Sequence, residues 1–399
     1  MVRRTAPDHG TPSPEWGAIT AATSVAVPLD ITEARPPGKK HGCKQRNRGT
    51  RAWTAPAFSK KGRMMDRRQA VIDALEFRRP AHVPWSIHAP ASLVEQAREQ
   101  LGLPAGADVC GDHVGIVSSG LGRLEPIGGT LARDPYGVTW ERGPEHGMGM
   151  PVEHPLREAD LDTIDWPDPT DHAWYGGLDE KLHDAGDRFT LFLVRFSLFE
   201  RAWLLRGMEN LMIDMFERPD FVEALLDAIC EQNLAQIDRA AALGVDAVHF
   251  CDDYGAQTGM LIGLPMWRRF IRPRLARQYD AVRAAGLYVS HHSCGNVTEL
   301  LDDFVEIGLN LLNPLQPEVM DAPGLLRRYR GKLAFFGGLS DQQTLPHGGP
   351  DAVAAETRAL LEAGRDGGYV FAPAGSIGAD VPLENFLAML RVLRDQEMA

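Results

Sequence analysis

The stretch FTLFLVRFSLFERAWLLRGMENLMIDMFE (189–217) decides the fold, because it joins a short apolar strand pattern to a long helical one. The same pairing recurs along the chain, where apolar runs of strand length alternate with helical runs. The further strand candidates are VDAVHFCDD (245–253), LYVSHHSCG (287–295), GLNLLNP (308–314), LAFFGG (333–338) and YVFAPA (369–374). Strands joined by helices predict a parallel sheet, and strands that are apolar throughout predict a sheet buried on both faces.

Two weaker segments bring the predicted strand count to eight. VPWSIH (83–88) follows a predicted helix that begins after Asp66 and stops before Pro80, and another weak strand lies near 109–117. Eight strands in this alternation over residues 65–399 predict an α/β fold of the (β/α)8 TIM-barrel type. A doubly wound open sheet is the alternative, but no G-x-G-x-x-G motif follows the first strand.

A shorter pattern interrupts the alternation of strands and helices. DPYGVTWERG (134–143) predicts a β-hairpin that is added to the mouth of the barrel.

The first 64 residues differ from the rest in charge and pattern. They carry 12 Lys and Arg against 4 Asp and Glu, are rich in Pro and Gly, and show no sustained periodicity. We therefore expect residues 1–64 to be a disordered basic extension, or to lie upstream of a true translation start at Met64 or Met65. Residues 65–399 would then form the barrel domain.

A chain that begins at Met65 is expected to fold as cooperatively as the full chain, because the removed segment lacks an apolar face to bury. Calorimetric melting of the two chains measures this. A large fall in melting temperature on truncation would show that the segment packs against the barrel.

The overall composition limits the class of protein. Hydrophobic residues make up 44% and charged residues 24%, as in globular proteins. No apolar run approaches the roughly 18 residues of a membrane span. The net charge of −12 argues against a nucleic-acid partner. Five cysteines without a paired framework favour a reducing, cytoplasmic location.

Polar side chains gather where the predicted strands end, which is where barrel enzymes place their active sites. Ser197 and Glu200 follow one strand, Cys251-Asp252-Asp253-Tyr254 ends the next, and Asn313 and Gln316 follow a later one. If the protein is an enzyme, Glu200 and Asp253 should converge with His292 and Cys294 on one cavity.

His292 and Cys294 are the sharpest single feature. Residues two apart in a strand share a face, and imidazole and thiolate are good zinc ligands. The alternative is a hydrogen-bonded histidine beside a buried cysteine, without a metal. Asp252 and Asp253 are adjacent, so one of them should reach the pocket while the other caps the following turn. The sequence leaves open which one does so.

Several segments resemble the uroporphyrinogen decarboxylase superfamily. They are CDDYGAQTGMLIGLPMWRRFIRPRL (251–275), HHSCGNV (291–297), LFERAWLLRGMEN (198–210), NLLNPLQPEVMD (310–321), FFGGLSDQQTLPHG (335–348) and GGYVFAPAGSIGADVPLENF (367–386). The resemblance implies a (β/α)8 barrel and one of two chemistries. One is decarboxylation of porphyrinogens; the other is methyl transfer to or from corrinoid proteins, in part by zinc-dependent members.

Departures from the family pattern favour methyl transfer. Decarboxylases carry an arginine-rich segment after the first strand that binds the substrate's carboxylates, whereas VPWSIHAPASLVEQ (83–96) has no arginine. Zinc-dependent members add a cysteine in the final strand's loop, but here that loop reads APAGS (372–376). The resemblance thus implies zinc on His292 and Cys294, with a carboxylate as third ligand in place of the cysteine: Glu200 or Asp253, or else Asp252.

The predicted function is methyl transfer from a small or methoxylated substrate to a corrinoid, assisted by Zn²⁺. A ligand set with fewer thiolates makes the metal more Lewis acidic, which suits an oxygen leaving group. Asp253 and Glu200 would be the catalytic carboxyl groups, and Asn313, Gln316, Tyr254 and Ser197 would bind the substrate. The expected partners are a corrinoid protein and a second copy of the chain. Uroporphyrinogen decarboxylation (a carboxy-lyase activity) and a non-catalytic binding barrel are the alternatives.

Overall fold

Seven parallel strands form a curled sheet in the order β1-β6-β7-β10-β11-β12-β13. This computed structural model describes residues 66–142 and 149–398, so the extension predicted at 1–64 lies outside the described residues. The strands are β1 Val114–Ser118, β6 Phe189–Arg195, β7 Ala247–Cys251, β10 Tyr288–His292, β11 Leu311–Leu315, β12 Ala334–Leu339 and β13 Tyr369–Pro373. The predicted TIM-barrel type of fold is confirmed.

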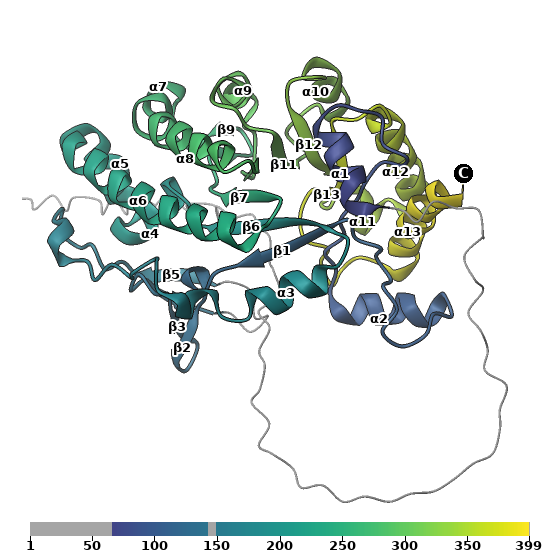
Figure 1. Ribbon diagram of the computed structural model, residues 1–399, viewed down its shortest axis with the longest axis horizontal. Helices are drawn as coiled ribbons and strands as arrows, with labels where there is room; N and C mark the ends of the chain where they lie inside the picture. The colour runs from purple at the N-terminus through teal and green to yellow at the C-terminus, as the bar shows by residue number, and fades with distance from the viewer. Residues whose placement is uncertain (1–65, 143–148, 399) are drawn as a thin grey trace, which may run out of the picture.

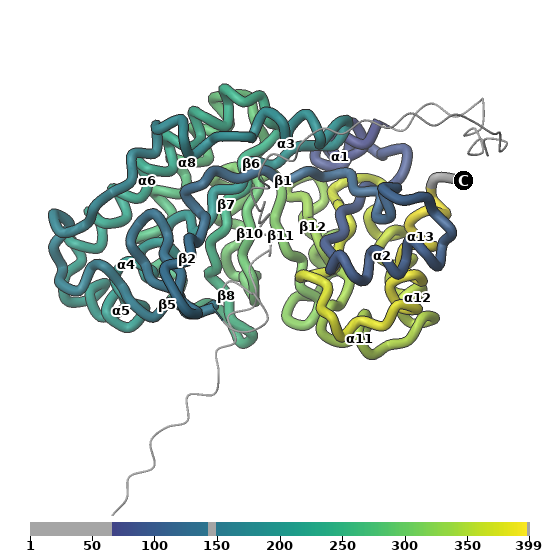
Figure 2. The backbone as a smooth tube through the Cα atoms, turned by 90° about the horizontal axis from the view of Figure 1, so that it is seen from below, coloured from purple at the N-terminus to yellow at the C-terminus, as the bar shows by residue number. Residues whose placement is uncertain are grey.

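Helices cover the outer face of the curled sheet (Figures 1 and 2). The first begins after Asp66 as predicted, because the Asp66 carboxylate accepts a hydrogen bond from the backbone N–H of Gln69. The longer helices are α1 Arg67–Leu75, α2 Ala91–Gln100, α3 Leu178–Ala185, α4 Phe199–Arg206, α5 Met208–Glu217, α6 Pro219–Leu243, α8 Arg272–Ala284, α9 Leu301–Ile307, α10 Ala322–Arg328, α12 Gly349–Gly364 and α13 Leu383–Met398. Within the described ranges, no helix is both long and apolar enough to span a membrane.

The predicted eighth strand at 83–88 is reduced to a closing segment. Only Trp85 forms a bridge, with Phe371 of β13, and the Trp85 carbonyl accepts a hydrogen bond from the N–H of His113, just before β1. Pro84 has no N–H to donate, so the segment cannot form a full ladder. The barrel is therefore closed by one bridge rather than by an eighth regular strand.

Alternate residues of the strands point into the barrel. The lower interior is filled by an apolar cluster that includes Leu191, Ala247, Leu311 and Phe336. Because side chains alternate along a strand, His249 and Cys251 share the inward face of β7 with Ala247. Towards the carboxyl ends the inward positions thus change from apolar to polar, which sets the place of the site.

An antiparallel sheet of four short strands is added beside the barrel: β2 Glu125–Gly128, β3 Leu131–Arg133, β4 Thr139–Glu141 and β5 Met150–Glu153. The predicted hairpin is confirmed as the β3–β4 pair. A buried ion pair ties its turn to α4, because Arg201 donates to Asp134 at 2.5 Å and both side chains are almost fully buried. The Asp134 carboxylate also accepts from the N–H groups of Tyr136 and Val138, which fixes the turn.

Candidate active site

The neighbours of His292 determine which atom its Nδ1 faces. The Asn313 amide Nδ2 donates to the carbonyl of Phe336 at 3.3 Å, which directs Asn313 Oδ1 towards His292 Nδ1, 2.6 Å away. Because an amide oxygen can only accept, Nδ1 carries a proton, and in the neutral ring Nε2 is therefore the nitrogen with the lone pair. This is the arrangement of a metal-binding histidine with a fixed tautomer.

The Nε2 atom of His292 faces the thiol of Cys294 and the carboxylate of Asp253. Cys294 Sγ lies 3.2 Å from Nε2, and Asp253 Oδ1 lies 3.6 Å from it. The ligand atoms of the three residues all lie within 4.8 Å of one another. Nitrogen, sulfur and carboxylate oxygen are the donors that Zn²⁺ prefers, so the residues fit a zinc ion with one coordination position left for a further ligand. Burial raises the pKa of Cys294, which is thus a thiol in the absence of a metal.

Two glycines bring the loops after β7 and β10 together. The N–H of Cys294 donates to Asp253 Oδ1 at 2.8 Å, across the two loops. A Cβ atom at Gly295 would lie 2.4 Å from the backbone carbon of Gly255, and Gly295 has a φ of +79°. Only glycine permits this approach, so the two positions hold Asp253 beside Cys294.

Asp252 and Asp253 have different surroundings. The carboxylate of Asp252 accepts from the N–H groups of Leu198, Phe199 and Glu200 and from the hydroxyl of Tyr254. It therefore caps the first turn of α4 and holds its neighbour Tyr254, whereas Asp253 joins the potential metal ligands. The sequence could not distinguish the two, because β7 ends at Cys251 and strand alternation stops there.

Glu200 lies in the first turn of α4 and is buried. Its Oε2 atom has no hydrogen-bond partner in the part of the chain that the structure describes. Burial, followed by the nearby Asp253 and Asp252 carboxylates, raises its pKa well above the usual value, which favours the protonated form of the carboxyl group. Glu200 is outside the group formed by Asp253, His292 and Cys294.

The predicted substrate-binding residues lie in different places. Asn313 bonds to His292 and also lines a small cavity inside the barrel. Gln316 accepts from the N–H of Gly295 at 3.0 Å. Tyr254 and Ser197 are fully buried and do not line that cavity. Substrate contact by these four residues stays a prediction.

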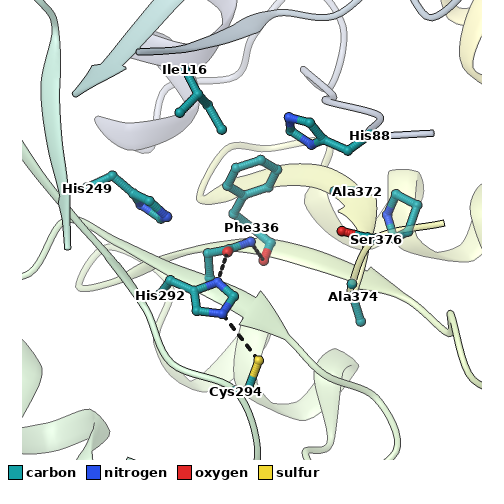
Figure 3. Close-up of a pocket in the computed structure, with 12 residues that line it drawn as sticks. His88, Ile116, His249, His292, Cys294, Phe336, Ala372, Ala374 and Ser376 are labelled. Atoms are coloured by element: carbon teal, nitrogen blue, oxygen red, sulfur yellow. Dashed lines mark hydrogen bonds between the residues drawn. The ribbon is translucent and has the colours of Figure 1, made fainter. Parts of the chain in front are cut away.

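A small cavity lies inside the barrel above the apolar cluster (Figure 3). It offers about 40 Å³ to the centres of water-sized molecules, and one water needs roughly 10–15 Å³ by this measure. Imidazole groups of His88, His249 and His292 face it, together with the side chain of Cys294. Its lining contains no lysine or arginine.

The remaining wall of the cavity is mostly apolar. It consists of Ile116, Phe336, Ala372, Pro373 and residues 374–376. The final loop, where zinc-dependent relatives were expected to carry a third cysteine, thus does face the cavity, but it presents Ser376 there.

His249 was not singled out in the sequence, because it sits within the apolar run VDAVHFCDD. Its parity with Cys251 is the signal that could have identified it. Its Nδ1 lies 2.7 Å from Ser290 Oγ, and its ring centroid lies 6.2 Å from that of His292. Burial is the main reason that its pKa lies well below the usual value, so the ring is neutral.

Fold and site together define a TIM-type barrel protein whose polar residues converge at the carboxyl ends of the strands. The chain belongs to the uroporphyrinogen decarboxylase (URO-D) family, whose model matches residues 136–396, more than half of its length. The resemblance inferred from the sequence is thereby confirmed. No curated protein matches the chain.

A solved structure supports the fold. A methyltransferase from Methanosarcina mazei is similar with a TM-score of 0.62 at 18% identity, over 84% of this chain and 99% of that one. A putative vitamin-B12 independent methionine synthase from Listeria monocytogenes has a TM-score of 0.41 at 11% identity, over 79% of this chain and 96% of that one.

Proposed function

We propose that this protein is a methyltransferase that removes a methyl group from the oxygen of a small methoxy compound and passes it to a corrinoid. The observation that carries the proposal is the group of Asp253, His292 and Cys294, in which Asn313 orients the ring of His292. This group lies beside a small cavity whose lining contains no lysine or arginine. The structural similarity to a methyltransferase from Methanosarcina mazei agrees with this choice.

The reaction requires electrophilic stabilisation of the methoxy oxygen, which is the leaving group. When the methyl carbon bonds to its acceptor, the carbon–oxygen bond breaks and its electron pair stays on oxygen, which then needs a cation or a proton. Zinc held by His292, Cys294 and Asp253 would supply a Lewis acid for that oxygen. Glu200 lies at the same end of the barrel, and its raised pKa would suit it to donate the proton to the released alcohol or phenol.

The cavity argues against porphyrinogen decarboxylation. A substrate with eight carboxylates requires positive side chains, whereas the lining contains no lysine or arginine. Space of about 40 Å³ corresponds to roughly three waters. This suits the methoxy end of a substrate rather than a tetrapyrrole ring.

The function is tested by supplying zinc-loaded protein with cob(I)alamin and a methoxylated aromatic compound, and by following the absorbance change as the cobalt is methylated. A parallel reaction with uroporphyrinogen follows coproporphyrinogen. We expect methylation and no coproporphyrinogen. Turnover of the porphyrinogen at an enzymatic rate would contradict the proposal. A protein that binds methoxy compounds but transfers no methyl group to free or protein-bound corrinoid would favour the non-catalytic barrel.

A further inference from the structure

His249 occupies a position that the proposed zinc group does not use. It lies on the inward face of β7, in register with Ser290 of β10, and its ring faces the cavity across from His292 (Figure 3). The residue as a whole is 2% exposed. Its closest polar contact is the Ser290 hydroxyl, and no carboxylate contacts it among the described residues.

The contact with Ser290 determines which ring nitrogen of His249 carries the proton. Ser290 is 1% exposed, and within the described ranges its Oγ has no other hydrogen-bond partner than His249 Nδ1. If Nδ1 carried the proton, the serine hydroxyl hydrogen would be buried without an acceptor, which is costly. The serine therefore donates to Nδ1, and the proton of the neutral imidazole sits on Nε2.

The Nε2–H group of His249 then lacks a protein acceptor. In residues 66–142 and 149–398 no hydrogen bond forms at this atom, although the side chain lines the cavity. Buried donors are nearly always paired, so a water or a bound molecule must accept this hydrogen bond.

We infer that His249 is a substrate-binding residue whose Nε2–H donates a hydrogen bond to the oxygen of an uncharged methyl ether, and that Ser290 is the positioning residue that holds this tautomer. The identity of the ligand as a methyl donor rests on the proposed function. The direction of the hydrogen bond rests on the contacts of His249 alone.

The surroundings narrow the ligand class further. Ile116 and Phe336 form an apolar wall that suits hydrocarbon beside the oxygen. The nearby Asp253 and the absence of lysine and arginine from the lining disfavour an anion. A methoxy group attached to a neutral carbon skeleton meets both requirements.

The first test measures the tautomer directly in the metal-free full chain. Long-range ¹⁵N–¹H spectra of histidine-labelled protein report which ring nitrogen carries the proton, and the signals of His249 are those lost in His249→Gln. We expect the Nε2–H form, and a mixture of both forms in Ser290→Ala. An Nδ1–H or doubly protonated ring in the wild-type protein would overturn the inference.

The second test compares two probes of nearly equal shape, anisole and ethylbenzene, of which only anisole carries an ether oxygen. Dissociation constants come from NMR titrations of the metal-free protein. We expect the wild type to prefer anisole by roughly three- to tenfold, the range of one hydrogen bond. His249→Met, which has no donor, should lose this preference, whereas His249→Gln, which is of similar length and has one, should retain part of it. His172→Gln, an exposed site on another part of the surface, is the control and should behave as wild type.

Equal preference for anisole in His249→Met and wild type would overturn the inference. Neither test requires zinc or methyl transfer. A protein that fails the demethylation assay but shows the Nε2–H form and the anisole preference would refute the proposed function alone. A working demethylase with the opposite tautomer would refute this inference alone.

Discussion

Replacing Cys294 with serine is expected to weaken zinc binding by more than about a hundredfold, beyond the 10–100-fold typical of losing a residue that only supports a ligand. The change removes the thiolate from a group of three ligand atoms that lie within 4.8 Å of one another. A serine hydroxyl is a poor replacement because it stays protonated near neutral pH. Competition with a chromophoric chelator measures the affinity.

The matched control for this variant is Cys230→Ser. Cys230 is also a buried free cysteine, but its Sγ donates to the carbonyl of Arg274 on the outer helices. Zinc affinity should be unchanged there. Asn313→Ala should give an intermediate loss, because it releases the His292 ring without removing a ligand atom. Wild-type affinity in Cys294→Ser would exclude the proposed metal group.

Replacing Asp252 with alanine is expected to lower the free energy of unfolding by about 3–5 kcal/mol, because four buried donors lose their acceptor at once. Those donors are the N–H groups of residues 198–200 and the hydroxyl of Tyr254. Urea unfolding of the metal-free protein measures the loss.

Asp253→Ala is the matched comparison. Among the described residues its carboxylate accepts one backbone hydrogen bond, from Cys294, so we expect a smaller loss of stability than in Asp252→Ala, while zinc affinity falls. Asp252→Ala should thus mainly lower the free energy of unfolding, whereas Asp253→Ala should mainly lower the zinc affinity. If Asp253→Ala unfolds more easily than Asp252→Ala, the assignment of cap and ligand is reversed.

The sequence predicts the fold better than the details of its closure. Alternation of apolar strand patterns with helices is a long-range signal, and each of the six clear strand candidates appears in the sheet. The segment at 83–88 has a similar composition, but its hydrogen bonding depends on Pro84 and on neighbours distant in sequence. Such pairing is a tertiary property that local pattern cannot supply.

The candidate site likewise has features that the sequence pattern predicts and features that depend on the folded chain. The shared face of His292 and Cys294 follows from strand periodicity alone. The tautomer of His292 depends on an amide of β11 and a carbonyl of β12, which only the folded chain brings together. The unpaired donor of His249 likewise depends on Ser290, 41 positions away along the chain.

The closing segment has a thermodynamic consequence for ligand binding. It carries His88 to the cavity wall, while His249 and His292 come from strands in the middle of the sheet. A ligand that contacts both sides would add a link between the segment and the sheet, which are now joined by the Trp85–Phe371 bridge and a few further backbone hydrogen bonds. Occupancy of the cavity would then raise the free energy needed to separate the closing segment from β13. Slower amide exchange at Ser86 and Phe371, whose N–H groups bond across this contact, would therefore report saturation of the site.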